Sequence, residues 1–119
     1  MPRMGQFTVP ARLTGPTGRS ETVPVLVDTG ATFLALPRSI AKRLALRTVR
    51  RQRVRVAGGR VTTWPVAEVR LQVGNSYTPA LCFIMPRGPA LLGAFALQSL
   101  LLAVDPVHER LVPVREAYV

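Results

Sequence analysis

The sequence has few of the side chains on which most enzymes depend. It contains one cysteine, one histidine and six acidic residues among 119. A zinc site normally takes three or four Cys, His or carboxylate ligands, so this supply argues against one. The single histidine, His108, has no nucleophile motif nearby, which argues against a Ser-His-Asp relay. No P-loop and no Gly-x-Gly-x-x-Gly motif occurs. We therefore expect neither a metal ion nor another cofactor.

Long apolar runs and paired cysteines are also missing. No apolar stretch approaches the roughly 20 residues that cross a bilayer, and the N-terminus lacks the apolar core of a signal peptide. Cys82 has no second cysteine for an internal disulfide, which fits a reducing compartment, and we expect it to be a small buried hydrophobic side chain. The sequence thus predicts one cytoplasmic domain, residues 1–119, without membrane contact.

Positive charge is the one kind of charge in excess. Sixteen basic residues, all arginine except Lys42, face six acidic ones and give a net charge of +10, with the densest run between Arg38 and Arg60. Such a chain can bind nucleic acid or acidic partners, or can carry a solvated, solubilising face. Nucleic-acid binders usually present aromatic residues for base stacking. The chain has one Trp, two Tyr and four Phe, and we expect Trp64 and Tyr77 to be packing residues, so nucleic acid is the less favoured partner.

Short apolar runs between turn signals predict an all-β fold, either a sandwich or a barrel. The expected strands are 7–13, 22–27, 33–36, 52–56, 60–64, 67–73, 80–85 and 90–93, with a closing hairpin of 101–104 and 110–114. A helical period is expected over 37–46, where Ile40 and Leu44 share a face, and over 95–100. The tip of the hairpin 52–64 contains two adjacent glycines, which supply the positive φ values of tight turns.

Two segments that lie far apart in the sequence resemble a known family when taken together. An apolar strand leads directly into Asp-Thr-Gly-Ala at 28–31, and about sixty residues later Leu-Leu-Gly at 91–93 repeats an apolar-apolar-Gly signature. With the glycine-tipped hairpin between them, this arrangement resembles the retropepsin-like aspartic peptidases, nearer to the small bacterial members than to the viral ones. The resemblance covers roughly residues 6–114 and implies an acid-protease barrel.

The resemblance further implies an endopeptidase in which two Asp28 carboxylates activate a water molecule. Two carboxylates that share one proton can provide both a base and an acid, as is known for aspartic proteases. The chain contains a single Asp-Thr-Gly, so the second carboxylate has to come from another copy across a two-fold axis. The expected partners are therefore a second copy of the chain and a peptide or protein substrate.

The resemblance also implies roles for the neighbours of the catalytic Asp28. The Thr29 hydroxyl would bond across to the partner's loop, and Gly30 would let the backbone turn without crowding the substrate. The other expected site residues are Ala31, Leu92 and Gly93, which support the loop together with Leu91, and Val56, Ala57, Gly58 and Gly59, which form a flap tip over bound peptide.

The sequence departs from the viral pattern at two positions. Viral members usually place an acidic residue after Asp-Thr-Gly-Ala and an arginine after the apolar-apolar-Gly, whereas Thr32 and Ala94 stand there here. The two losses are consistent with each other, since an unpaired buried charge is costly. They imply that the dimer interface and the substrate-binding contacts differ from those of the viral members. The basic flap strands, between Arg50 and Arg60, suggest the hypothesis that substrates carry acidic residues around an apolar scissile pair.

Two other functions stay open at this point. The chain could be a catalytically silent relative that keeps the dimeric fold to bind a peptide or a protein, or it could be a basic β-barrel that binds nucleic acid. The complete Asp-Thr-Gly disfavours the silent relative, because a pure binder has no need for two carboxylates that repel each other. Asp105, the other aspartate, lacks this motif and is expected to cap the last turn.

Overall fold

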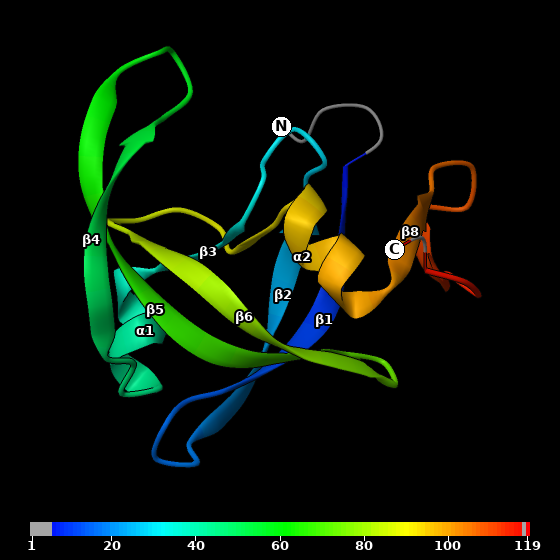
Figure 1. Ribbon diagram of the computed structural model, residues 1–119, viewed down its shortest axis with the longest axis horizontal. Coiled ribbons are helices and arrows are strands. Elements are labelled where there is room, and N and C mark those ends of the chain that lie inside the picture. The colour runs from blue at the N-terminus through cyan, green and yellow to red at the C-terminus, as the bar shows by residue number, and fades with distance from the viewer. Residues whose placement is uncertain (1–5, 118) are drawn as a thin grey trace.

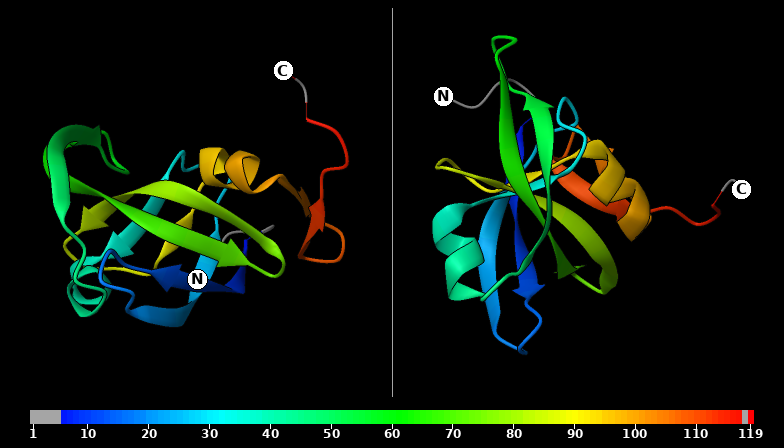
Figure 2. Two further views of the ribbon diagram at one scale, coloured as in Figure 1. Left: turned by 60° about the horizontal axis from the view of Figure 1, so that its bottom comes forward. Right: turned by 60° about the vertical axis from the view of Figure 1, so that its left-hand side comes forward.

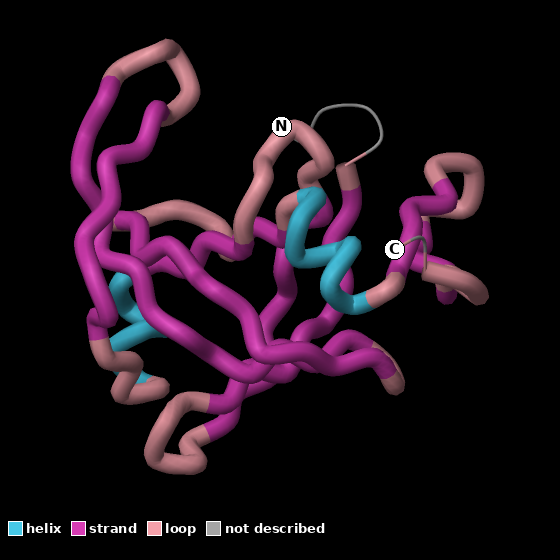
Figure 3. Tube along the Cα trace, viewed as in Figure 1, coloured by secondary structure: helices cyan, strands magenta, loops and turns pink. Residues whose placement is uncertain are grey.

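Strands form most of the computed structural model, which describes residues 6–117 and 119 (Figures 1 and 3). The strands are β1 (Phe7–Thr14), β2 (Ser20–Val27), β3 (Leu34–Pro37), β4 (Thr48–Arg55), β5 (Val61–Val73), β6 (Ser76–Met85), β7 (Leu91–Leu92), β8 (Leu102–Asp105) and β9 (Arg110–Pro113). The first seven build one sheet in the order β1-β2-β7-β3-β6-β5-β4, and β8 pairs with β9. A further pairing of β1 with β5 curls the large sheet toward a barrel. The all-β prediction is confirmed.

Two short helices complete the described chain. They are α1 (Arg38–Arg43) and α2 (Ala94–Leu100). Pro37 is the extended N-cap of α1, and Ile40 and Leu44 are buried beneath the helix. The helix is shorter than the predicted 37–46, because the chain turns into the left-handed region at Ala45, with φ 54°. Neither helix is long and apolar enough to cross a membrane.

Strand β5 corrects one sequence prediction. We expected two strands, 60–64 and 67–73, separated near Pro65, but one strand runs through the whole of Val61–Val73. Proline removes a backbone donor and is tolerated in a strand where one side has no neighbouring strand. Here β5 pairs with β4 at Pro65, while its pairing with β6 begins only at Val66. The proline therefore does not interrupt the sheet.

The hydrophobic core fills the space between the curled sheet and the helices. Six leucines are among its largest fully buried side chains: Leu13, Leu34, Leu36, Leu44, Leu71 and Leu92. Cys82 is also fully buried, on the central strand β6, and its burial raises the pKa of the thiol to about 12. Both the burial of Cys82 and the central position of its strand are as predicted. No polar side chain is buried among the described residues, so this core is a rigid apolar base for the loops above it.

Two hairpins project at opposite ends of the molecule. The β4–β5 hairpin extends at one end and the β8–β9 hairpin lies at the other (Figures 1 and 2). Between them, the loop 28–33 that follows β2 lies beside α2. The residues of the predicted site are therefore divided between this loop, with the adjoining Leu92 and Gly93, and the tip of the β4–β5 hairpin.

Candidate active site

The end of β2 places Asp28 at the start of an exposed loop. Val25 and Val27 are buried and anchor the strand in the core. The backbone N–H of Asp28 then donates to the carbonyl of Leu92, with 3.0 Å between N and O. Because β2 and β7 run parallel, with Val27 opposite Leu92, the two segments of the sequence resemblance are neighbours in one sheet.

The start of α2 holds the far side of the same loop. The N–H groups of Ala94 and Phe95 donate to the carbonyls of Ala31 and Thr32, at 2.9 and 2.8 Å. Gly93 lies so close to the loop that a Cβ there would be 2.5 Å from the carbonyl carbon of Thr32. Only glycine fits this approach without displacing backbone atoms. Three backbone hydrogen bonds thus fix the loop, one to β7 and two to the start of α2.

The Asp28 side chain is half-buried and bonded within its own loop. Its Oδ1 accepts a hydrogen bond from the N–H of Gly30 at 3.0 Å, and its backbone carbonyl accepts one from Ala31 at 3.1 Å. A Cβ at position 30 would lie 3.2 Å from Oδ1. Gly30 has no positive φ, so the reason for glycine here is the space beside the carboxylate rather than the turn. Thr29 is exposed and forms no side-chain hydrogen bond within residues 6–117 and 119.

A cleft of about 1280 Å³ separates the loop from the β4–β5 hairpin. Among the residues that line it, Asp28 is the one acid. Its apolar lining includes Phe33, Ala35, Val54, Val56, Trp64, Phe83 and Leu91. Its basic lining consists of Arg50, Arg53, Arg55, Arg60 and Arg87. The cleft can therefore hold an extended chain whose apolar side chains lie near a carboxylate.

The tip of the β4–β5 hairpin has the tight geometry that its two glycines predict. Gly58 and Gly59 adopt φ values of 91° and 87°. The N–H of Gly59 donates to the carbonyl of Val56 at 2.9 Å, and Arg55 donates through Nη1 to the Gly59 carbonyl at 2.7 Å. Ala57, Gly58 and Gly59 are exposed, and of the four predicted flap residues all but Gly58 line the cleft.

The sequence did not indicate several residues of the cleft. Phe83 was expected only as part of a central strand, yet it lines the cleft and stacks on Phe33, with ring centroids 4.9 Å apart. Leu91 was expected behind the loop, but it lines the cleft as well. Arg87 lies in the turn after β6, which carried no functional signal. Trp64 also lines the cleft. The prediction that Tyr77 is a packing residue is wrong, because Tyr77 is 67% exposed.

Comparison with known protein families agrees with this fold and this site. The sequence pattern of a family described as "Aspartyl protease" matches residues 9–95. The chain belongs to the aspartyl protease family. The match includes the Asp28 loop, the β4–β5 hairpin and the Leu-Leu-Gly segment, and it ends before the β8–β9 hairpin.

Solved structures of viral proteases share the fold of this family member. EIAV protease, solved in complex with the inhibitor HBY-793, superposes with a TM-score of 0.65 at 19% identity, over 80% of this chain and 88% of that one. The simian foamy virus (mac) protease gives a TM-score of 0.57 at 16% identity, over 77% and 92%. No curated protein sequence matches the chain. The retropepsin-like fold is confirmed, whereas the nearness to bacterial members stays a prediction.

The second aspartate of the chain lies outside the cleft. Asp105 accepts hydrogen bonds from the N–H groups of Val107 and His108, and its Oδ2 lies 2.8 Å from His108 Nδ1 and 3.0 Å from Arg110 Nε. The bonds from His108, followed by that from Arg110, hold the pKa of Asp105 below its usual value. The predicted capping role is confirmed. Within the described residues, no three His, Cys, Asp or Glu side chains gather as metal ligands.

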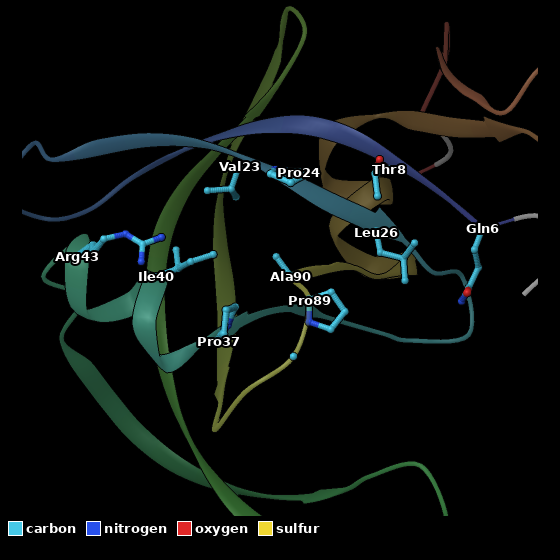
Figure 4. Close-up of a pocket in the computed structure, with 11 residues that line it drawn as sticks. Gln6, Thr8, Val23, Pro24, Leu26, Pro37, Ile40, Arg43, Pro89 and Ala90 are labelled. Carbon is cyan, nitrogen blue, oxygen red and sulfur yellow. The ribbon is translucent and has the colours of Figure 1, made fainter. Parts of the chain in front are cut away.

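A second, smaller cavity shares no residue with the cleft. It measures about 630 Å³ and is lined by residues of β1, β2, α1 and the turn before β7. Figure 4 shows an apolar surface that includes Leu26, Pro37 and Pro89, with Arg43 at one end. Arg43 is already paired with Glu21 at 3.0 Å. No carboxylate is among the residues that line the cavity, so it is not a candidate for an aspartic catalytic site.

Proposed function

We propose that this chain is an aspartic endopeptidase that acts as a homodimer, with one Asp28 from each copy in the catalytic pair. The observation that carries the proposal is that Asp28 is the one acidic residue lining the cleft. Hydrolysis by carboxylates alone needs both a base and an acid at the scissile bond. A second copy of the chain across a two-fold axis supplies the missing carboxylate.

The two carboxylates act through one shared proton. The ionised Asp28 accepts a proton from water as the water oxygen attacks the peptide carbonyl carbon. The protonated partner polarises the carbonyl oxygen, and the amide nitrogen takes up a proton as the C–N bond breaks.

Two features of the loop support the dimer. Thr29 is exposed beside Asp28, and its hydroxyl has no partner in the described part of one chain. Phe95, which contacts the loop through its N–H and lies edge-on to Phe33, is 51% exposed. Aromatic side chains are enriched at interfaces relative to the rest of a protein surface. We propose that the Thr29 hydroxyls bond across this interface.

The cleft supports a peptide as the substrate. Phe33, Trp64 and Leu91 give apolar walls to the cleft that Asp28 also lines, as in sites that bind apolar side chains. The exposed tip at Val56–Gly59 can close over the bound chain and exclude bulk water. In this proposal the loop residues 28–31, supported by Leu92 and Gly93, form the catalytic floor and the hairpin tip forms the flap.

Cleavage of a denatured protein tests the proposal. The protein and its Asp28→Asn variant are compared from acidic to neutral pH, and we expect cleavage by the parent alone. Asp105→Asn is the matched control, since it removes the other aspartate and should retain activity. Equal activity in the parent and Asp28→Asn, or no activity in either, would exclude the peptidase. Peptide binding without cleavage would instead support a catalytically silent relative.

A further inference from the structure

The cleft around Asp28 is strongly basic. Five arginines line it, namely Arg50, Arg53, Arg55, Arg60 and Arg87, against the single carboxylate of Asp28. Four of them lie between positions 50 and 60, on strand β4 and the adjoining hairpin tip, and Arg87 comes from the turn after β6. The fold thus adds a distant arginine to the cleft that the basic run already lines.

Most of these guanidinium groups have no partner among the described residues. Arg55 donates to the Gly59 carbonyl, but Arg50, Arg53, Arg60 and Arg87 form no side-chain hydrogen bond or ion pair in the described chain. The ion pairs there join Glu21 to Arg43, and Asp105 to His108 and Arg110, and none of these residues lines the cleft. The positive charge of the cleft is therefore not neutralised internally.

Protection of an edge strand accounts for only part of this charge. Strand β4 is the last strand of the sheet, and charged side chains on such a strand prevent pairing with other chains. That role applies to Arg50 and Arg53, which lie on β4. It does not apply to Arg60 and Arg87, which lie outside β4 and line the same cleft.

We propose that the substrates are acidic peptides, in which Asp or Glu residues flank an apolar scissile segment. This inference rests on the proposed function and names the substrate class of the same site. Arginine binds carboxylates through two parallel N–H bonds, which fixes both the charge and the position of its partner. In this proposal the apolar side chains of the cleft accommodate the residues at the scissile bond, and its arginines bind the acidic flanks.

The composition of the cleft favours a peptide over a nucleic acid. A continuous phosphate chain carries a charge at every residue, so it would bring phosphates against the Asp28 carboxylate. A peptide can instead place apolar side chains at Asp28 and carboxylates only at the arginines. Of the three aromatic side chains that line the cleft, Phe83 is buried, which leaves Phe33 and Trp64 for base stacking.

A matched set of three peptides tests the preference. They share one apolar scissile segment and carry Glu, Gln or Lys at the flanking positions. At low ionic strength we expect kcat/KM to be about tenfold higher for the Glu peptide than for the Gln peptide, the size expected for several exposed ion pairs. The Lys peptide should be cleaved most slowly, and added salt should reduce the differences by screening. Equal kcat/KM for the Glu and Gln peptides would overturn the proposal.

Variants of the arginines localise the effect. Arg60→Gln and Arg87→Gln should each lower the Glu-to-Gln ratio of kcat/KM by about two- to threefold, as expected for loss of an exposed ion pair. Arg70→Gln is the control, because Arg70 is equally exposed and lies on β5 but not on the cleft. All three changes are on the surface, and thermal unfolding checks that each variant is folded. A ratio lowered equally by Arg70→Gln would show a net-charge effect and contradict the proposal.

Binding to the Asp28→Asn protein separates this inference from the peptidase itself. Fluorescence anisotropy compares the Glu and Gln peptides on this variant with a single-stranded oligonucleotide, of the same charge as the Glu peptide, on the parent protein, which keeps the Asp28 carboxylate. Tighter binding of the Glu peptide than of the other two supports acidic-peptide recognition, even if the parent cleaves nothing. Tighter binding of the oligonucleotide would overturn it in favour of nucleic acid.

Discussion

Gly93 and Thr32 are in such close backbone contact that a single added carbon would overlap: a Cβ at Gly93 would lie 2.5 Å from the Thr32 carbonyl carbon. The same approach lets Ala94 and Phe95 donate their N–H groups to the loop that starts at Asp28. The two halves of the family signature are thus one structural unit. Glycine is required at position 93 because the loop that starts at Asp28 lies directly against it.

A Gly93→Ala substitution should therefore damage both stability and activity. The Cβ would meet backbone atoms of Thr32 and Phe33, which cannot rotate away, so we expect a loss of about 3 kcal/mol, at the upper end for overpacked sites. Chemical denaturation measures the loss. Gly74→Ala is the control, since its φ of 58° costs an alanine only about 1–2 kcal/mol and its Cβ would meet nothing within 4 Å. Equal losses in the two variants would refute the steric explanation.

The Asp28 loop and its support were predictable because their signals are local. The motif at 28–31 follows directly on an apolar strand, and paired glycines at 58–59 specify a tight hairpin by themselves. Cys82 was predictable as a core residue for a similar reason, since its whole strand is apolar. In each case the short-range pattern and the fold require the same residue.

The lining of the cleft was not predictable, because it depends on how distant strands pair. Phe83 lies on a strand that is apolar on both faces, so the sequence does not tell which side chain faces the cleft. Arg87 stands in a turn, and only the fold brings that turn to the same cleft as the β4–β5 hairpin. The continuity of β5 at Pro65 depends on the absence of a neighbour on one side. Such long-range relationships leave no trace in local spacing.

Mixing of wild-type and Asp28→Asn protein tests whether two copies share one site. If each active unit needs two Asp28 carboxylates, mixed dimers are inactive, and after exchange the activity should fall with the square of the wild-type fraction. Specific activity should also fall on dilution, as the dimer dissociates. Activity that stays proportional to the amount of wild-type protein would show that one chain suffices.

The Asp105 cluster predicts a pH-dependent contribution to stability. Bonds from His108 and Arg110 lower the pKa of Asp105 in the folded protein, so its stabilising effect is complete above the ordinary carboxyl pKa and is lost as the pH falls through the lowered value. Asp105→Asn should therefore reduce the melting temperature at neutral pH, and the difference from wild type should vanish in acid. Glu109→Gln, in the same turn but without an ion pair among the described residues, should show little difference at any pH. A loss of equal size at every pH would contradict the electrostatic role.

A comparison of alanine variants at Gly18 and Gly58, which have the same φ, can test the function of the flap tip. Gly18 and Gly58 both adopt φ 91°, and a Cβ at either position would meet nothing within 4 Å. Alanine should therefore cause the same backbone strain in both turns and similar losses of stability. Only Gly58 belongs to the tip that we propose closes over the substrate, so Gly58→Ala should lower kcat/KM several-fold while Gly18→Ala leaves it nearly unchanged. The measurements are steady-state kinetics of the two variants on one peptide, with their melting temperatures determined in parallel. Equal kcat/KM values for the two variants would mean that the hairpin tip takes no part in the reaction.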